Sequence, residues 1–175
     1  MNHPEQMYTY HYWANQTLLN RIKELPAAVL REEVNTSFPT IAQAFGHIYA
    51  VESVWYQVLN GARMQDALEM CMPLEKETLQ HSADQFANDF AQLAEQYREW
   101  LRSQDDLDRT ILLENPYAGT RHTRLSEIVL HVVNHGTYHR GNVSAMLRQL
   151  GHASTMNDYS LFWYQEAGDS INLSK

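Results

Sequence analysis

The stretch His131-Val132-Val133-Asn134-His135-Gly136-Thr137-Tyr138-His139-Arg140-Gly141-Asn142 places three histidines at steps of four residues. Each residue of an α-helix turns the chain by about 100°, so residues four apart lie about 40° apart around the axis. The sequence from about Thr123 to Leu150 has the apolar repeat of one long helix. On that helix His135 and His139 lie inside the apolar stripe, and His131 lies at its edge. Burying imidazoles is costly unless something satisfies their nitrogens, and a metal ion would do so.

Three further long helices are predicted before this one. The first opens at His3-Pro4-Glu5 and ends before Pro26, because proline suits the first turn of a helix and not its interior. The second begins at the capping box Thr40-Ile41-Ala42-Gln43 and runs to about Leu59, where Asn60-Gly61 stops it. The third is capped by Ser82 and runs to about Leu101.

The remaining segments are shorter. Residues 62–79 contain Pro73 and have weak periodicity, which predicts a connection, and the β-prone residues 110–113 before a turn at 115–119 predict a hairpin or irregular excursion. A last short helix is predicted over 158–167, ending at Gly168. We therefore expect an all-α fold over one domain of residues 1–175. It would be a four-helix bundle with a short extra C-terminal helix and a small hairpin before the fourth helix.

The charge and composition exclude several classes of function. The net charge of −8 and the presence of only three lysines argue against a nucleic-acid partner, whose phosphates need cations, and against an anionic membrane surface. No apolar run approaches the roughly 20 residues of a membrane span, and no signal pattern opens the chain. The single cysteine, Cys71, excludes an intrachain disulfide framework. These features predict a cytoplasmic protein.

His47 lies on the apolar stripe of the second helix, so it would meet His135 and His139 if those helices are neighbours. Three neutral imidazoles suit zinc, nickel, copper or iron, and three protein ligands leave a coordination position open, as in catalytic sites. Each histidine also has a simpler interpretation, since His47 alone could be a hydrogen-bonded core residue and the His135/His139 pair could lie on a solvated face.

Other residues near these histidines receive structural interpretations. We expect His131 to support the site structurally rather than bind a metal, and His11 to line the pocket, with a weaker case as a fourth ligand. His3, His81, His122 and His152 are predicted to be solvated. Arg140 projects about 140° from His135 and is predicted to make a salt bridge or a subunit contact. Gly141 suggests the close approach of a helix or subunit.

Several of these segments resemble the DinB/YfiT-like family of small bacterial metal-binding bundles. The resembling residues are Gly46-His47-Ile48 with Glu52 and Trp55, the segment 135–142, Trp13-Ala14-Asn15, and Gly151 with Asp158-Tyr159. The resemblance implies a four-helix bundle, commonly dimeric, in which His47, His135 and His139 hold a divalent ion, usually nickel or zinc. The family usually has Gln where this chain has Asn142. Since Asn142 projects beside the ligands, we expect a pocket of altered shape or polarity.

Some members of that family are thiol-dependent S-transferases or isomerases, which gives the first functional hypothesis. The chain would be a metal-dependent thiol S-transferase that joins a low-molecular-weight thiol to a small electrophile, acting as a homodimer with no nucleic-acid or membrane partner. One alternative is a metal-dependent hydrolase that uses bound water, and another is a non-catalytic, stress-induced metal-binding protein. No catalytic side chain is identified, because Cys71 has no base placed beside it.

Overall fold

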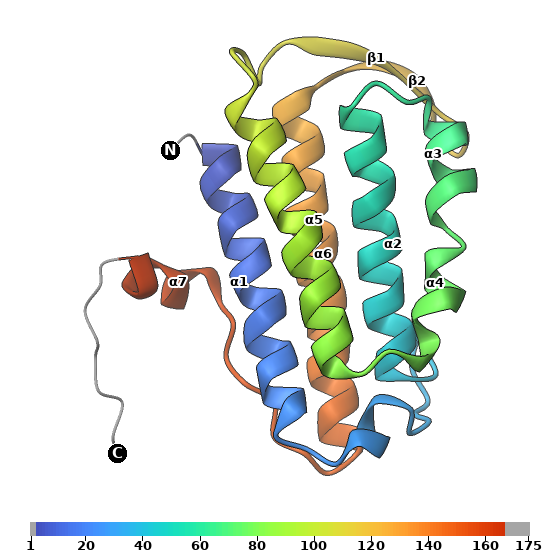
Figure 1. The fold of residues 1–175 in the computed structure, drawn as a ribbon, viewed down its shortest axis with the longest axis vertical. Coiled ribbons are helices and arrows are strands. Elements are labelled where there is room, and N and C mark those ends of the chain that lie inside the picture. Colours follow the sequence, from blue (N-terminus) through green and yellow to red (C-terminus); the bar gives the residue numbers. More distant parts are fainter. Residues whose placement is uncertain (1–2, 167–175) are drawn as a thin grey trace.

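Four long helices lie side by side along the long axis of the molecule in a computed structural model that describes residues 3–166 (Figure 1). They are α1 (His3–Lys23), α2 (Ile41–Leu59), α5 (Ala83–Arg102) and α6 (Leu125–Gln149). Helix α6 packs against both α1 and α2, and α5 packs against the same two helices. The chain is therefore mostly helical, as predicted, and α2 and α6 are the neighbours that a shared histidine site requires.

The ends of these helices follow the predicted capping signals. Thr40 and Ser82 accept hydrogen bonds from the backbone N–H groups of Gln43 and Gln85, and each of these glutamines bonds back to the capping residue. Gly151 comes directly after Leu150, the residue that caps the C-terminal end of α6, and has a φ of +82°, a conformation that glycine adopts without strain. Helix α6 begins at Leu125 and not at Thr123, because Thr123 belongs to a strand.

The segment 62–79 is helical and is not the simple connection that its weak periodicity predicts. It contains α3 (Met64–Cys71), α4 (Leu74–Glu77) and a 3₁₀ turn at Thr78–Gln80, all packed along α2 (Figure 1). A second 3₁₀ turn spans Ala27–Leu30. In α3 only Met64, Ala67 and Cys71 are buried, so the apolar repeat is too short to stand out in the sequence.

A two-stranded antiparallel sheet covers one end of the helices (Figure 1). Strand β1 (Thr110–Asn115) pairs with β2 (Gly119–Arg124), from Thr110 opposite Arg124 to Asn115 opposite Gly119. The predicted hairpin is thus confirmed, and the fold is not purely all-α. The short helix α7 (Tyr159–Glu166) packs Phe162 near Tyr10. The predicted end of this helix, at residues 167–168, lies outside the described residues.

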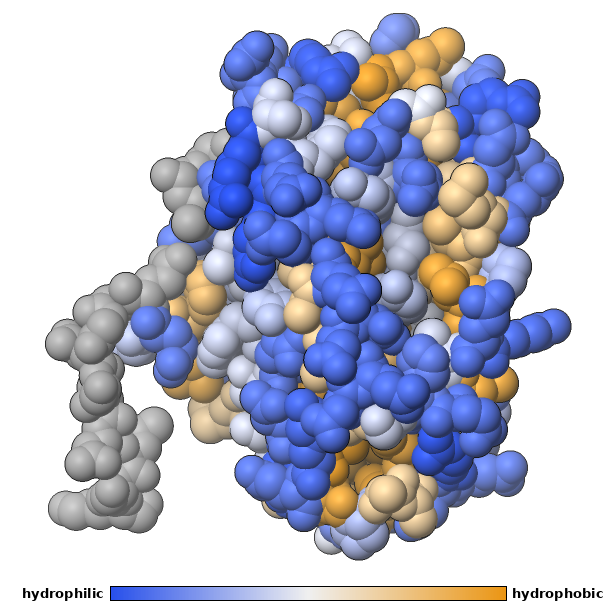
Figure 2. Space-filling model, viewed as in Figure 1, coloured by the Kyte–Doolittle hydropathy of each residue, from blue (hydrophilic) through white to orange (hydrophobic). Residues whose placement is uncertain are grey.

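The buried side chains form two main apolar clusters, one toward the hairpin and one toward the opposite end. The first includes Val54 and Val132, and the second includes Ile48 and Val143. Three buried polar residues of α1 and α6 lie at the level between them, namely His11, His139 and Arg140. The face in Figure 2 is largely hydrophilic, with apolar side chains in patches between polar ones. Within residues 3–166 we find no helix with the length and apolar character of a membrane span.

Candidate metal centre

The structure brings together the three histidines that the sequence singled out. His47 comes from α2, and His135 and His139 come from successive turns of α6. The Nε2 atom of His135 lies 3.2 Å from Nε2 of His47 and 3.1 Å from Nε2 of His139. One nitrogen from each ring lies within 4.8 Å of the others, so the cluster could hold a metal ion.

The spacing of these nitrogens fits a shared ion. Two nitrogens bound to one zinc ion at about 2.05 Å lie about 2.9 Å apart at a right angle and about 3.3 Å apart at a tetrahedral angle. The two measured Nε2 separations fall between these values. Two imidazole lone pairs at such a distance need a proton or a cation between them, and an ion held by all three rings would satisfy each one.

A carboxylate sets the orientation of the His47 ring. Nδ1 of His47 donates a hydrogen bond to Oε1 of Glu75 at 2.6 Å, which leaves Nε2 unprotonated and directed at the other two histidines. Glu75 lies in α4, inside the segment predicted as a connection, so no sequence pattern singled it out. It is the kind of acceptor that a metal-binding histidine requires for its second nitrogen.

The amide of Asn142 lies beside the third histidine. Its Nδ2 is 3.4 Å from Nδ1 of His139, and the opposite amide orientation would place an oxygen acceptor there. Asn142 therefore contacts a member of the histidine cluster. The prediction that its side chain projects beside the clustered histidines is confirmed.

Burial keeps the α6 histidines neutral. Desolvation, followed by the neighbouring His139 and His47, lowers the pKa of His135 to about 3. Desolvation and then His47 lower the pKa of His139 to about 4. The ring of Phe38 lies over the cluster, 5.1 Å from the His47 ring and 5.3 Å from the His139 ring. At neutral pH the imidazoles of His135 and His139 are thus uncharged, and each can donate a lone pair to a cation.

The remaining histidines lie outside the cluster. His131 is exposed, and its ring stands edge-on to Trp55 with the centroids 4.9 Å apart. His3 and His122 are exposed, as predicted. His152 is half-buried, and so is His81, whose Nδ1 lies 2.9 Å from Oδ2 of Asp89, so the prediction that these two are solvated is wrong.

Comparisons with known proteins identify the family of this chain. The DinB family model matches residues 1–170. The chain belongs to the DinB family. It is 38% identical to Protein DinB of Bacillus subtilis (strain 168) over 159 residues, which span 91% of this chain and 92% of that relative. The family resemblance noted in the sequence is therefore confirmed.

A solved structure supports the fold of this DinB-family chain. The crystal structure of a DinB-like protein from Bacillus cereus ATCC 10987 superposes with a TM-score of 0.60 at 23% sequence identity. The match covers 86% of this chain and 91% of that one. The arrangement of long helices is thus shared by the two proteins.

A second buried polar cluster in this DinB-family fold, which we call the His11 network, joins α1, α2 and α6. Nδ1 of His11 accepts a hydrogen bond from Arg140 at 3.1 Å, which leaves the Nε2–H to donate to Oε2 of Glu52 at 3.0 Å. The other members are Tyr8, Asn15 and Thr137, bonded to Glu52 or Arg140 at 2.6–2.9 Å. His11 is 1% exposed, and both of its ring nitrogens have hydrogen-bond partners. The prediction that it lines the pocket or supplies a fourth ligand finds no support in this geometry.

The packing of α1 against α6 explains why the prediction for Arg140 was wrong. Arg140 is 1% exposed and bonds within the chain, because α1 packs on a face of α6 that lies away from the predicted apolar stripe. That packing is close, since a Cβ atom added to Gly136 would overlap the His11 ring. At Gly141, by contrast, no neighbouring atom of residues 3–166 lies within 4 Å of an added Cβ. The glycine that permits close helix contact within the chain is therefore Gly136 and not Gly141.

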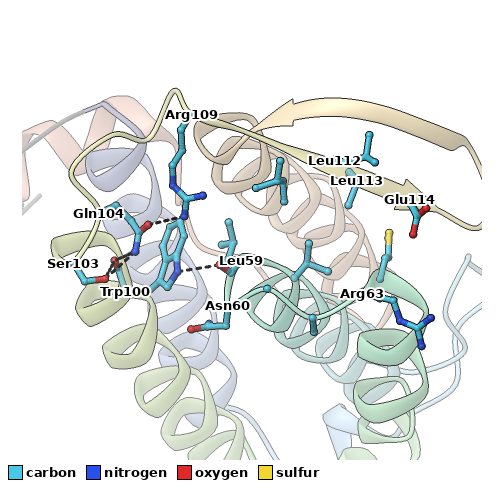
Figure 3. A pocket seen from close by; sticks show the side chains of 15 residues that line it. Leu59, Asn60, Arg63, Trp100, Ser103, Gln104, Arg109, Leu112, Leu113 and Glu114 are labelled. Carbon is cyan, nitrogen blue, oxygen red and sulfur yellow. Dashed lines mark hydrogen bonds between the residues drawn. The ribbon is translucent and has the colours of Figure 1, made fainter.

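Two hollows bear on ligand binding, and the larger one contains none of the three clustered histidines. It has a volume of about 550 Å³ and lies under β1, between the end of α2 and the end of α5 (Figure 3). Several of its polar side chains bond to one another or to the backbone. Arg109 donates to Gln104 at 3.1 Å, and the Trp100 indole donates to the carbonyl of Leu59, also at 3.1 Å. This hollow holds none of the three clustered histidines.

A smaller hollow of about 330 Å³, which we call the His47 pocket, includes the His47 ring in its wall. Most of its lining is apolar. The apolar residues are Val51, Val54, Trp55, Met64, Leu68 and Met72. Because it adjoins the histidine cluster, this pocket and not the largest one is the place where a small molecule could meet a bound ion.

Proposed function

We propose that this DinB-family protein holds one divalent transition-metal ion, zinc or nickel, on the Nε2 atoms of His47, His135 and His139. The single observation that carries the proposal is the convergence of three Nε2 atoms at 3.1–3.2 Å steps. The hydrogen bond from His47 to Glu75 and the low pKa values of His135 and His139 support it, since each makes a ring nitrogen available as a ligand.

We further propose that the reaction is the transfer of a small electrophilic group to a low-molecular-weight thiol, within a homodimer of four-helix bundles. A divalent ion on three imidazoles keeps a coordination position open and favours the thiolate form of a thiol. In the reaction a sulfur–carbon bond forms while the bond from that carbon to its leaving group breaks. The thiol proton passes to solvent.

The protein's own residues position and shield the reactants. Glu75 fixes the His47 ring, and Phe38 covers one side of the cluster, which limits the access of water. The thiol must come from outside the chain, since Cys71 is buried in α3 and burial raises the pKa of its thiol. The chain therefore contributes positioning and the metal ligands, and no nucleophile.

The test is an assay of protein prepared without a histidine tag. Metal-free and zinc- or nickel-loaded forms are mixed with an aryl halide, with and without added thiol, and the product is followed by absorbance. We expect turnover that needs both metal and thiol and that is lost in His135→Ala. Turnover that is indifferent to thiol would contradict transfer and favour hydrolysis. One tightly bound ion with no turnover would favour a non-catalytic metal-binding protein.

A further inference from the structure

The His47 pocket differs in charge from the rest of this acidic chain. None of its lining residues is Asp, Glu, Lys or Arg. The largest hollow, by contrast, is lined by Arg63, Arg109 and Glu114 among others. Within a protein of net charge −8, a hollow without acidic or basic side chains disfavours charged organic groups, because such a group among the apolar side chains would lose its hydration and gain no partner there.

The pocket is built on the same helix face as a member of the histidine cluster. Val51, Val54 and Trp55 follow His47 by one to two turns of α2, so they share its side of the helix. Helix α3 supplies Met64 and Leu68 from the opposite side. A molecule lying along Val51, Val54 and Trp55 would contact the His47 side chain at one end.

Two further elements close the pocket. The hairpin contributes Asn115 and Tyr117 from its turn, and α6 contributes His131, one helical turn before His135. The thioethers of Met64 and Met72 and the Trp55 ring are polarisable surfaces that favour aromatic and alkyl groups. The volume of about 330 Å³ lies at the lower end of the range for small-molecule sites.

We infer that the His47 pocket binds a small, uncharged, apolar molecule, aromatic or alkyl, with one end beside the histidine cluster. This assignment rests on the proposed function only in identifying that molecule as the electrophile. The binding itself follows from the apolar lining, the lack of charge and the position of His47. A charged thiol would then occupy space outside this pocket.

Helix α3 offers a matched pair of variants. Leu68 is half-buried and lines the pocket, whereas Met70 is 62% exposed and is not part of the lining. Leu68→Lys places a cation in the pocket, and Met70→Lys places the same charge on the outer side of the same helix. Leu68→Asn is a milder second variant in case the lysine prevents folding.

The experiment measures binding of the neutral fluorophore N-phenyl-1-naphthylamine and of its anionic sulfonate analogue. We expect saturable binding of the neutral molecule to metal-free and metal-loaded protein, at least tenfold tighter than the sulfonate. Leu68→Lys should weaken that binding at least tenfold, Leu68→Asn less, and Met70→Lys by less than twofold. Thermal unfolding verifies that each variant is folded.

Three results would overturn the inference: no saturable binding, equal or tighter binding of the sulfonate, or equal effects of the Leu68 and Met70 variants. Failure of the proposed function would look different. The neutral fluorophore would still bind as described, but metal stoichiometry or thiol-dependent turnover would be absent.

Discussion

Helix α6 takes part in two histidine-containing clusters that differ in how the ring nitrogens are satisfied. In the His11 network both nitrogens of the ring have protein partners of opposite character, the Arg140 guanidinium and the Glu52 carboxylate. In the other cluster, the Nε2 atoms of His47, His135 and His139 have one another as neighbours. Burial of a histidine alone does not therefore indicate a metal ligand. The deciding feature is a nitrogen whose nearest polar neighbours are other imidazoles.

The largest expected effect is the loss of metal from variants of the three-histidine cluster. Wild-type protein should bind about one divalent ion per chain, because three protein ligands converge on one point. His135→Ala and His139→Ala should bind none, as measured by elemental analysis after dialysis. Chelation should also lower the melting temperature of the wild type, since the ion binds only the folded state.

The exposed His122→Ala is the matched control for these variants, and its metal content should equal that of the wild type. Retention of one ion per chain by His139→Ala would show that the three-histidine cluster is not the metal site and so does not differ from the His11 network in this respect.

The second effect concerns the stability of the His11 network. Glu52→Gln removes the buried carboxylate that accepts hydrogen bonds from Tyr8 and His11, and a hydrogen bond to a charged group contributes about 1.5–3 kcal/mol. Urea unfolding of the metal-free protein should show a loss of this order. The exposed pair of Glu95 with Arg98 offers the control, because Glu95→Gln should cost less than about 1 kcal/mol. If Glu52→Gln were as mild as Glu95→Gln, the network would not be a stabilising unit.

A third prediction concerns Glu75. Replacing this carboxylate by an amide in Glu75→Gln weakens the acceptor that fixes the His47 ring, and such changes reduce metal affinity by about 10–100-fold. Competition with a chromogenic chelator measures this affinity. Glu77→Gln, an exposed position on the same short helix, should leave it unchanged. Equal affinities in the two variants would exclude the proposed role of Glu75.

The long helices and the His135/His139 pair were predictable from the sequence, because both depend on spacing and capping residues within a single helix. The ends of the long helices followed from Thr40, Ser82 and Gly151, and the pair His135/His139 followed from a step of four. Glu75 could not be found in this way, because it lies 28 residues from His47 on a four-residue helix.

Arg140 was misplaced for a related reason. The apolar stripe of α6 marks one buried face, but α1 and α2 both pack on this helix and bury a wider arc. The additional arc is polar and, apart from the Nε atom of Arg140, is hydrogen-bonded within the chain, so it has no hydrophobic signal. Gly136 marks this contact, yet a sequence does not show which of Gly136 and Gly141 faces a neighbour.

The fourth prediction uses these two glycines of α6. Gly136→Ala should destabilise the protein by about 1–3 kcal/mol, because the new methyl group overlaps the His11 ring. Gly141→Ala should stabilise it by up to about 1 kcal/mol, because alanine favours helix and the space there is open. The midpoints of urea unfolding measure both. The same sign for both substitutions would contradict the placement of α1 against Gly136.

The smallest effect is a dependence of stability on pH in the metal-free protein. The folded-state pKa values of His135 and His139, about 3 and about 4, lie below the ordinary value of 6.5. Their contribution is therefore complete above pH 6.5 and is lost as the pH falls, since the unfolded chain takes up protons first. Between pH 7 and pH 6 the loss should be below about 1 kcal/mol per histidine. A stability that rises toward pH 6 would contradict this.

The most direct test is anomalous X-ray diffraction, at the absorption edge of the bound metal, from crystals of protein purified without a histidine tag. We predict one anomalous peak per chain, within about 2.0–2.2 Å of the Nε2 atoms of His47, His135 and His139. A peak elsewhere, for example between His81 and Asp89, or no peak after incubation with zinc or nickel, would contradict the account.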